Sequence, residues 1–303
     1  MEYYDLCLAW NWKHDSDFVR LFSGACHSRG LSLLQITPEN LREILLSLAE
    51  YGLNFQSFFD RATDADKSFI PVVEWARANE IYCVNPHERA SRGSNKAEMH
   101  LRLIGAGLYT PYTIILPPYL EQPEPAPVDL SPLGKRFTIK PAHGGGGEGV
   151  ITEATSMKQV LEARKAYPDD RYLLQAHIVP VNLEGRPAWF RVLYCAGRIF
   201  PCWWDTGTHI YTPLGEGEED RFGLGRLRQM TSTIAGLCHL DLFSTEIALT
   251  ADNLFIVIDY VNDQIDLRLQ SKALEGVPDY IVGDVAAGLV ELMARSCPSL
   301  PGV

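Results

Sequence analysis

The chain has 303 residues, of which 46% are hydrophobic and 21% charged, and its formal net charge at pH 7 is −11. This composition is typical of a globular protein and supplies enough apolar material for one large domain or two to three smaller ones. Because an acidic surface repels nucleic acids and anionic membranes, we expect neither as a partner, and a phosphate site would need its own cations or a metal ion.

The start of the chain, MEYYDLCLAW, lacks the basic and long apolar regions of a secretion signal, and nowhere do eighteen apolar residues run together. We therefore expect a cytoplasmic protein. The seven cysteines are scattered, odd in number and never arranged as C-x-x-C. This usage predicts reduced thiols rather than a disulfide framework or a zinc site.

Strand and helix signals alternate through residues 1–90. Strands are expected at 4–10, 31–36, 55–59 and 81–84, and helices at 15–28, 38–50 (with Thr37 as N-cap) and 66–79. This order predicts a small parallel sheet with helices on its faces. Ligands of such sheets bind beyond the carboxyl ends of the strands. Candidate substrate-binding residues there are Asn11, Lys13, Asp60 and Arg61, with ordinary loop residues as the alternative.

A helix is expected within residues 94–108. Its apolar residues Ala97, Leu101, Ile104 and Leu108 recur at helical spacing, which predicts one buried stripe. Lys96 lies off that stripe, so by default it is a surface lysine. The proline-rich residues 119–132 then predict a linker or loop.

Residues 137–150 read FTIKPAHGGGGEGV. Their alternating start predicts a strand that carries Lys140 on its polar face, just before a run of glycines. Glycines allow backbone N–H groups to approach a ligand oxygen closely, so the segment predicts a phosphate site. The residues concerned are Gly144, Gly145, Gly146, Gly147 and Gly149. Strand formers follow the run, which excludes the helix of a dinucleotide fingerprint, and no Gly-Lys-Ser/Thr follows as in a P-loop. A hairpin without a ligand is the alternative.

Further along, a helix should begin at Ser156, with Gln159 completing a capping box. A strand is expected at 172–178, a hairpin at 189–194 and 199–204, a mobile loop at 207–225 and a helix at 227–237. We found no internal repeat and no low-complexity tract.

Two strands, at 243–249 and 254–261, flank the turn 250–253. A turn of this even length places Glu246 opposite Val257, so that Asp259 becomes a diagonal neighbour on the same face, roughly 7 Å away. Two carboxylates this close in an apolar hairpin need a cation between them, and oxygen ligands suit Mg²⁺. Asn262 could add a third oxygen. Alternatively, each acid faces solvent or pairs with an arginine such as Arg268. An odd turn would put the two acids on opposite faces.

The order of these motifs resembles the ATP-grasp superfamily, and within it the glutathione-synthetase and peptide-ligating carboxylate–amine ligases. The resemblance covers nearly the whole chain. It comprises, in the family's usual order, Asn85-Pro86, Asn95-Lys96, GLYTPYT, FTIKPAHGGGGEGV, YLLQAHI, WFRVLYCAGRIF, LFSTEIAL and FIVIDYVND.

The resemblance implies an α/β fold that becomes α+β in its C-terminal part. A pre-ATP-grasp α/β domain with a small parallel sheet would occupy residues 1–90, and an ATP-grasp domain residues 91–303. The latter would contain a lid subdomain at about 134–178 and an antiparallel, metal-binding subdomain at about 179–303. The implied cofactors are ATP and Mg²⁺.

The resemblance also assigns roles to individual residues. Lys96 and Lys140 would contact the ATP phosphates, the loop from Gly144 to Gly149 would close over them, and Arg191 would contact the γ-phosphate or the reaction intermediate. The adenine-side hinge would be formed by Gln175, Ala176, His177 and Ile178. The Mg²⁺ ligands would be Glu246, Asp259 and Asn262.

The sequence departs from the family pattern at three places. Trp189 and Ala176 stand where acidic residues are common, and two residues rather than one separate Asp259 from Asn262, so Asp263 is an alternative third ligand. Arg268 could clamp a substrate carboxylate, because a guanidinium binds such groups through two hydrogen bonds. Its alternative role is a structural ion pair with Asp266 or Asp263.

These features favour an ATP-dependent ligase that joins a carboxylate to an amine through an acylphosphate. Its substrates would be small molecules or peptides, and a homodimer would be consistent with the family. Two alternatives keep the same nucleotide site. One is a small-molecule kinase of this fold, and the other is an ATP-binding regulatory protein without turnover.

Overall fold

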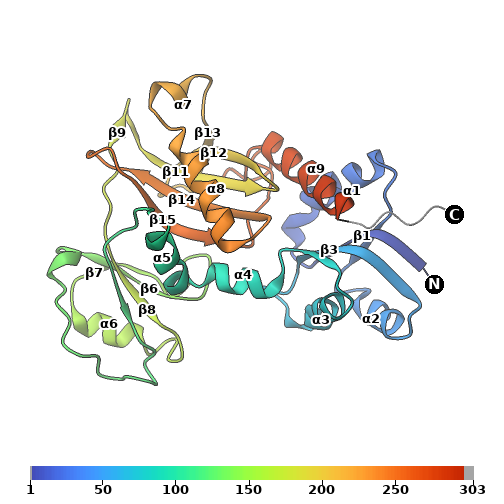
Figure 1. Cartoon of the computed structure of the whole chain (residues 1–303), viewed down its shortest axis with the longest axis horizontal. Coiled ribbons are helices and arrows are strands. Elements are labelled where there is room, and N and C mark those ends of the chain that lie inside the picture. The colour runs from blue at the N-terminus through green and yellow to red at the C-terminus, as the bar shows by residue number, and fades with distance from the viewer. Residues whose placement is uncertain (1, 297–303) are drawn as a thin grey trace.

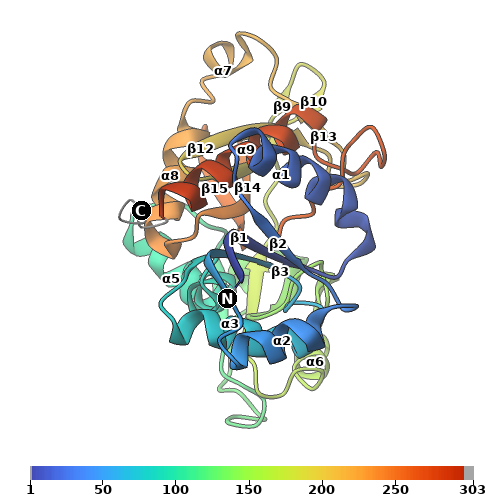
Figure 2. The same ribbon diagram turned by 90° about the vertical axis from the view of Figure 1, so that its right-hand side faces the viewer.

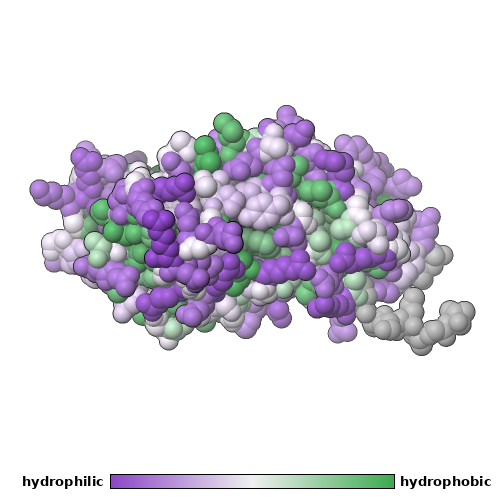
Figure 3. Space-filling model, turned by 90° about the horizontal axis from the view of Figure 1, so that it is seen from above, coloured by the Kyte–Doolittle hydropathy of each residue, from purple (hydrophilic) through white to green (hydrophobic). Residues whose placement is uncertain are grey.

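The computed structural model describes residues 2–296 of the chain (Figure 1). Within this range the strands form sheets of four, five and four strands and one separate two-stranded hairpin. No helix in the described range is long and apolar enough to cross a membrane. Seen from above, the surface is mainly hydrophilic, with small separate hydrophobic areas (Figure 3).

The N-terminal sheet is parallel, with the strand order β2-β1-β3-β4. Its strands are β1 (Glu2–Trp10), β2 (Leu33–Ile36), β3 (Leu53–Arg61) and β4 (Tyr82–Val84). Its helices are α1 (Ser16–Ser28), α2 (Leu41–Ala49) and α3 (Ile70–Ala78), with short 3-10 helices at Lys13–Asp15 and Lys67–Phe69. The predicted alternation of strands and helices is therefore confirmed.

The predicted start of α2 is wrong. The helix begins at Leu41, and Asn40 rather than Thr37 occupies the N-cap position. The side chain of Asn40 accepts a hydrogen bond from the backbone N–H of Thr37 at 2.8 Å. The intervening residues therefore form a local turn instead of the first turn of the helix.

Two helices, α4 (His87–Ser94) and α5 (Lys96–Gly105), follow the N-terminal sheet, and α4 runs between that sheet and the rest of the molecule (Figure 1). Residue 90, where we placed the domain boundary, lies inside α4. The predicted stripe on α5 is also wrong, because Leu101 and Ile104 are exposed whereas Met99 and His100 are buried. A polar residue can face the core here because His100 Nδ1 lies 2.7 Å from the hydroxyl of Tyr260.

The second four-stranded sheet, which we call the lid sheet, is antiparallel, with the order β5-β8-β6-β7. It consists of β5 (Thr113–Leu116), β6 (Phe137–Pro141), β7 (Ile151–Ala154) and β8 (Tyr172–Ala176), with α6 (Met157–Ala163) and a 3-10 helix at Ser131–Leu133. The glycine run thus joins two strands, as predicted. Arg164 is fully buried and donates hydrogen bonds to four backbone carbonyls within residues 117–123, where the proline-rich segment begins.

The five-stranded sheet is antiparallel, with the order β13-β12-β11-β14-β15. Its strands are β11 (Trp189–Cys195), β12 (Arg198–Trp204), β13 (Tyr211–Pro213), β14 (Leu242–Leu249) and β15 (Phe255–Asn262). The separate hairpin is β9 (Asn182–Leu183) with β10 (Arg186–Pro187). The segment predicted to be a loop, 207–225, contains β13 and the short helix α7 (Glu218–Arg221).

Helices cover both faces of the five-stranded sheet. Phe190 and Val192 pack into one apolar cluster with α8 (Arg226–Cys238), whereas Leu193 and Cys195 pack into another with α9 (Asp279–Arg295). Helix α9 also packs against α1, so the C-terminal helix returns to the N-terminal sheet (Figures 1 and 2). This closure brings the carboxyl ends of the parallel strands toward the five-stranded sheet.

The six cysteines within the described range are all free thiols, and Cys297 lies outside that range. Burial raises the pKa of most of them, as for Cys195 and Cys202, both to about 12. Five of these six thiols are buried, as expected, and Cys83 is partly exposed.

Candidate functional site

A cavity of about 970 Å³ lies where the three sheets meet. Its walls come from the carboxyl end of β3, from α4 and α5, from β6 and the glycine run, and from β11, β12, β14 and β15. It is lined by most of the residues that the sequence singled out: Lys96, Lys140, Gly144, Gly145, Gly146, Gly147, Arg191, Glu246, Asp259, Asn262 and Arg268.

The hairpin β14–β15 has a different register from the one predicted. Leu249 pairs with Phe255, so the turn contains the odd number of residues 250–254, and this alone would separate the two acids. A β-bulge follows, because Ile247 pairs with Val257 but Glu246 pairs with Asp259, which leaves Ile258 as the extra residue. The prediction that Glu246 and Asp259 lie on the same face is therefore right. The cause, however, is the bulge at Ile258 and not the predicted even turn. The two carboxylates are direct rather than diagonal neighbours.

One row of charged side chains crosses three strands of this sheet. Arg191 on β11 pairs with Glu246 on β14, which in turn pairs with Asp259 on β15. Arg191 Nη1 lies 3.2 Å from Glu246 Oε1, and Asn262 donates to Asp259 Oδ2 at 2.8 Å. The row thus contains one positive charge, on Arg191, followed by two negative charges, on Glu246 and Asp259. Because the two carboxylates repel each other, Asp259 requires further cations nearby.

The two lysines supply that charge. Lys140 is only 7% exposed, and its Nζ donates to the carbonyl of Ile258, the bulge residue, at 3.3 Å. The ammonium group also lies over the ring of Tyr260, 5.5 Å from its centre. Lys96 begins α5 and donates from Nζ to the carbonyl of Gly144 at 2.5 Å. Lys96 is therefore part of the cavity wall and not an ordinary surface lysine.

The pKa shifts at this site follow from burial and from the charge row. Burial lowers the pKa of both Lys96 and Lys140, with partial compensation by Asp259. Burial also raises the pKa of Glu246, and Arg191 offsets this only in part. Burial opposes ionisation of Asp259 as well, but the two lysines and the other donors hold the pKa of Asp259 below its ordinary value. The site is thus a compact, desolvated set of opposite charges.

The glycine run has a fixed base and an open tip. At the base, the backbone N–H of His143 donates to Asp170 at 2.8 Å, and His143 Nδ1 lies 2.9 Å from the same carboxylate. At the tip, Gly144 has φ 104°, which other residues rarely adopt, and an added Cβ would meet nothing within 4 Å. Gly149 differs, because a Cβ there would lie 2.7 Å from the ring of Tyr167. Gly149 is therefore required for packing and does not line the cavity.

The four predicted hinge residues do not line the cavity. Gln175 points into the protein and donates to Tyr260 at 2.6 Å and to Thr113 at 3.0 Å. His177 Nε2 lies 2.5 Å from the carbonyl of Thr152. Ala176 is the last residue of β8, and Ile178 lies two residues after it. Their role beside an adenine ring stays a prediction.

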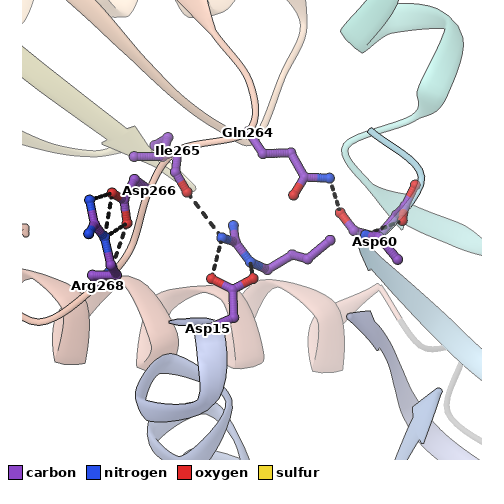
Figure 4. Close-up of polar contacts among 8 residues, drawn as sticks. Asp15, Asp60, Gln264, Ile265, Asp266 and Arg268 are labelled. Carbon is purple, nitrogen blue, oxygen red and sulfur yellow. Dashed lines mark hydrogen bonds and ion pairs between the residues drawn. The ribbon is translucent and has the colours of Figure 1, made fainter. Parts of the chain in front are cut away.

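At the end of the cavity near the parallel sheet, Arg268 contacts Asp266 through several hydrogen bonds, the shortest at 2.6 Å (Figure 4). The ion pair with Asp266, one of the two roles considered for Arg268, is thus present. Asp263 instead accepts a hydrogen bond from Asn85 at 2.9 Å, and burial raises the pKa of Asp263 to about 6. Arg61 does not line the cavity, because it forms a buried ion pair with Asp15.

Several aromatic residues of the cavity wall had not been predicted. Trp189, Trp204, His209 and Tyr211 line the cavity with Arg191, whose guanidinium is 4.9 Å from the ring centre of Trp204. Only Trp189 carried a signal in the sequence, since it stands two residues before Arg191 and so shares its face of β11.

The oxygen donors fit a magnesium ion. Within residues 2–296, no cluster of three or more His, Cys, Asp or Glu side chains could enclose a metal ion. Glu246 and Asp259 are adjacent, however, and Asn262 contributes an amide beside Asp259. Mg²⁺ is usually held by one or two carboxylates and takes its other ligands from phosphates and water. The site therefore suits an ion that arrives with a phosphate ligand.

The three sheets meet at one cavity, which the glycine run and the paired carboxylates both line. No protein-family model and no curated protein sequence matches the chain. Among solved structures, the chain is similar to D-alanine–D-alanine ligase from Bacillus anthracis complexed with ATP, with a TM-score of 0.66, 12% identity and 97% coverage of both chains. It is also similar to the macrocyclase MdnC from Microcystis aeruginosa bound with its precursor peptide MdnA (TM-score 0.65, 10% identity, 96% of this chain and 100% of that one).

A third similar structure is an ATP-grasp RimK domain protein from Sphaerobacter thermophilus, with a TM-score of 0.61 and 17% identity, covering 95% of this chain and 98% of the other. At these identities the similarity establishes the fold. The chain therefore has the ATP-grasp fold over nearly its whole length.

Proposed function

We propose that this protein is an ATP-dependent ligase that joins a carboxylate to an amine through an acylphosphate. The observation that carries the proposal is the charge arrangement in one cavity, where Lys96, Lys140 and Arg191 line the walls together with the pair Glu246 and Asp259 and with the glycine run. The neighbours in fold support it, since they include a D-alanine–D-alanine ligase, a macrocyclase bound with its precursor peptide and the ATP-grasp ligase PsnB complexed with a precursor peptide.

In the proposed reaction, a substrate carboxylate oxygen attacks the γ-phosphorus of ATP, and ADP leaves. The amine then attacks the acyl carbon, inorganic phosphate leaves, and the amine proton is released. Lys96 and Lys140 would bind phosphate oxygens, and Arg191 would stabilise negative charge on the transferred group. Mg²⁺ bound by Glu246, Asp259 and Asn262 would offset charge on the phosphates. Backbone N–H groups of the glycine run would cover them and exclude water.

The dimensions of the site suit both substrates. A cavity of about 970 Å³ is at the upper end of the range of pockets that enclose small ligands, so a nucleotide leaves room for a second molecule. The part of the cavity wall that contains Asp60 and Arg268 would receive the carboxylate or the amine. A reaction that consumes ATP, together with free cysteines, fits a cytoplasmic protein.

The test is to incubate the purified protein with Mg-ATP and a panel of amino acids, other carboxylates and peptides, and to measure both ADP and inorganic phosphate. A ligase releases the two in equal amounts, and hydroxylamine should trap the acylphosphate as a hydroxamate. A kinase would release ADP while the phosphate stays on the product. Normal ATP binding without ADP release across the panel would contradict the proposal, as would full activity of Glu246→Gln.

A further inference from the structure

Trp189 contacts Glu246 directly. The indole Nε1 donates to Glu246 Oε2 at 3.0 Å, while Arg191 Nη1 lies 3.2 Å from the other oxygen, Oε1. The strand pairing explains this geometry, because Glu246 lies opposite Arg191 and diagonal to Trp189, two residues earlier on the same face of β11. Each carboxylate oxygen of Glu246 therefore accepts a hydrogen bond from a different residue of β11.

The two donors have different consequences. Arg191 adds a positive charge, whereas the indole N–H is neutral and has no lone pair with which to bind a metal ion. A carboxylate oxygen that accepts one hydrogen bond keeps another lone pair free. Trp189 can therefore fix the orientation of Glu246 without weakening the negative charge that a cation would meet. Partners of this kind, behind a metal ligand, orient the ligand and tune its affinity.

We infer that Trp189 is a positioning residue that holds Glu246 in the orientation needed to bind Mg²⁺ together with ATP. The inference rests on the proposed function, since it requires that Glu246 is a metal ligand. It gives a role to a residue that stands where the resembling family commonly has an acid.

The chain offers a matched control. Trp203, on the neighbouring strand β12, donates from its indole Nε1 to Glu218 at 2.9 Å, and it does not line the cavity. Both Trp189→Phe and Trp203→Phe remove one indole–carboxylate hydrogen bond and keep an aromatic ring. Only the first of these bonds involves the proposed metal site.

The measurement is the calorimetric affinity for a non-hydrolysable ATP analogue over a range of Mg²⁺ concentrations. We expect Trp189→Phe to raise the Mg²⁺ concentration at half-maximal effect about 10-fold or more, the size of effect seen for residues behind a metal ligand. Affinity without Mg²⁺ should be unchanged, and Trp203→Phe should match the wild type in both conditions. Trp189→Leu is a second variant without the donor, in case the phenylalanine variant does not fold.

A double-mutant cycle tests whether the effect acts through Glu246. In a Glu246→Gln background, Trp189→Phe should cause no further change in the Mg²⁺ dependence. If the wild type binds the analogue in a Mg²⁺-dependent manner and Trp189→Phe does the same, the positioning role is refuted while the proposed function stands. An equal shift in both backgrounds would also refute it. If the wild type itself shows no Mg²⁺-dependent binding, the proposed nucleotide site fails as well.

Discussion

Removing one partner of the buried ion pair between Asp15 and Arg61 should strongly destabilise the protein. The two side chains are 1% and 3% exposed, and two hydrogen bonds of 2.8 and 2.7 Å join them. Arg61 Nη2 also donates to the carbonyl of Ile265 at 3.1 Å, so the pair links β3 to the segment that follows β15 (Figure 4). The guanidinium lies 5.3 Å from the ring centre of Phe18.

Asp15→Ala would leave the guanidinium buried beside apolar rings without its counter-ion. Breaking one side of such a pair typically lowers the free energy of unfolding by about 3–5 kcal/mol. Replacing both partners with apolar residues of similar size avoids the isolated charge and is often close to neutral. We therefore expect the double variant Asp15→Leu/Arg61→Met to be more stable than Asp15→Ala.

Urea unfolding followed by circular dichroism measures these differences. The control is the exposed pair Arg77 and Glu88, at 3.0 Å, with side chains 70% and 69% exposed. Glu88→Ala should change the free energy of unfolding by less than about 1 kcal/mol. The reasoning is refuted if Asp15→Ala costs no more than Glu88→Ala, or if the double variant is less stable than Asp15→Ala.

Three further predictions concern other buried basic side chains. Lys140→Ala should weaken ATP binding sharply, because the phosphates lose a buried cation. The exposed Lys165, changed in the same way, should leave ATP affinity intact, and equal affinity in the Lys140 variant would exclude Lys140 from the site. Arg164→Met should destabilise the lid sheet by about 2 kcal/mol or more, because four backbone carbonyls lose their hydrogen-bond donor. Hydrogen exchange of the backbone amides in β5 and β8 measures this effect, and unchanged exchange rates would contradict it. Burial, then Lys140, lowers the pKa of His100 to about 4 from 6.5. Between pH 6.5 and 4, His100 is therefore protonated in the unfolded chain but neutral in the folded protein. The free energy of unfolding should fall by up to about 3 kcal/mol as the pH drops from 6.5 toward 4. A His100→Gln variant with the same acid sensitivity in urea titrations would contradict this cause.

The sequence predicted the parts of the molecule that depend on local pattern. The parallel N-terminal sheet follows from alternating strand and helix signals, and the lid hairpin follows from the strand formers on either side of the glycine run. Lys96 shows the limit of this reasoning. Helical periodicity placed it off the apolar face of α5, but the face that packs contains His100, whose hydrogen bond to Tyr260 no local pattern reveals.

Tertiary pairing decided the rest of the site. The sequence left two possible roles open for Arg61 and two for Arg268. In the structure, each of these arginines forms an ion pair with an aspartate. Asp266 is two residues from Arg268 and could be considered in advance. Asp15 lies far from Arg61 in the sequence, so only the closure of α1 against β3 brings the two together.

The bulge at Ile258 shows how one irregular residue joins the two halves of the candidate site. It compensates for the odd turn and so aligns Asp259 with Glu246, which creates the carboxylate pair. The carbonyl of the same residue accepts the hydrogen bond of Lys140, which fixes a phosphate-binding candidate from the lid sheet beside that pair. A regular hairpin with this turn would separate the carboxylates. The bulge at Ile258 therefore determines two things. It sets where the ammonium group of Lys140 lies between the lid sheet and the five-stranded sheet, and it sets the geometry of the proposed metal ligands.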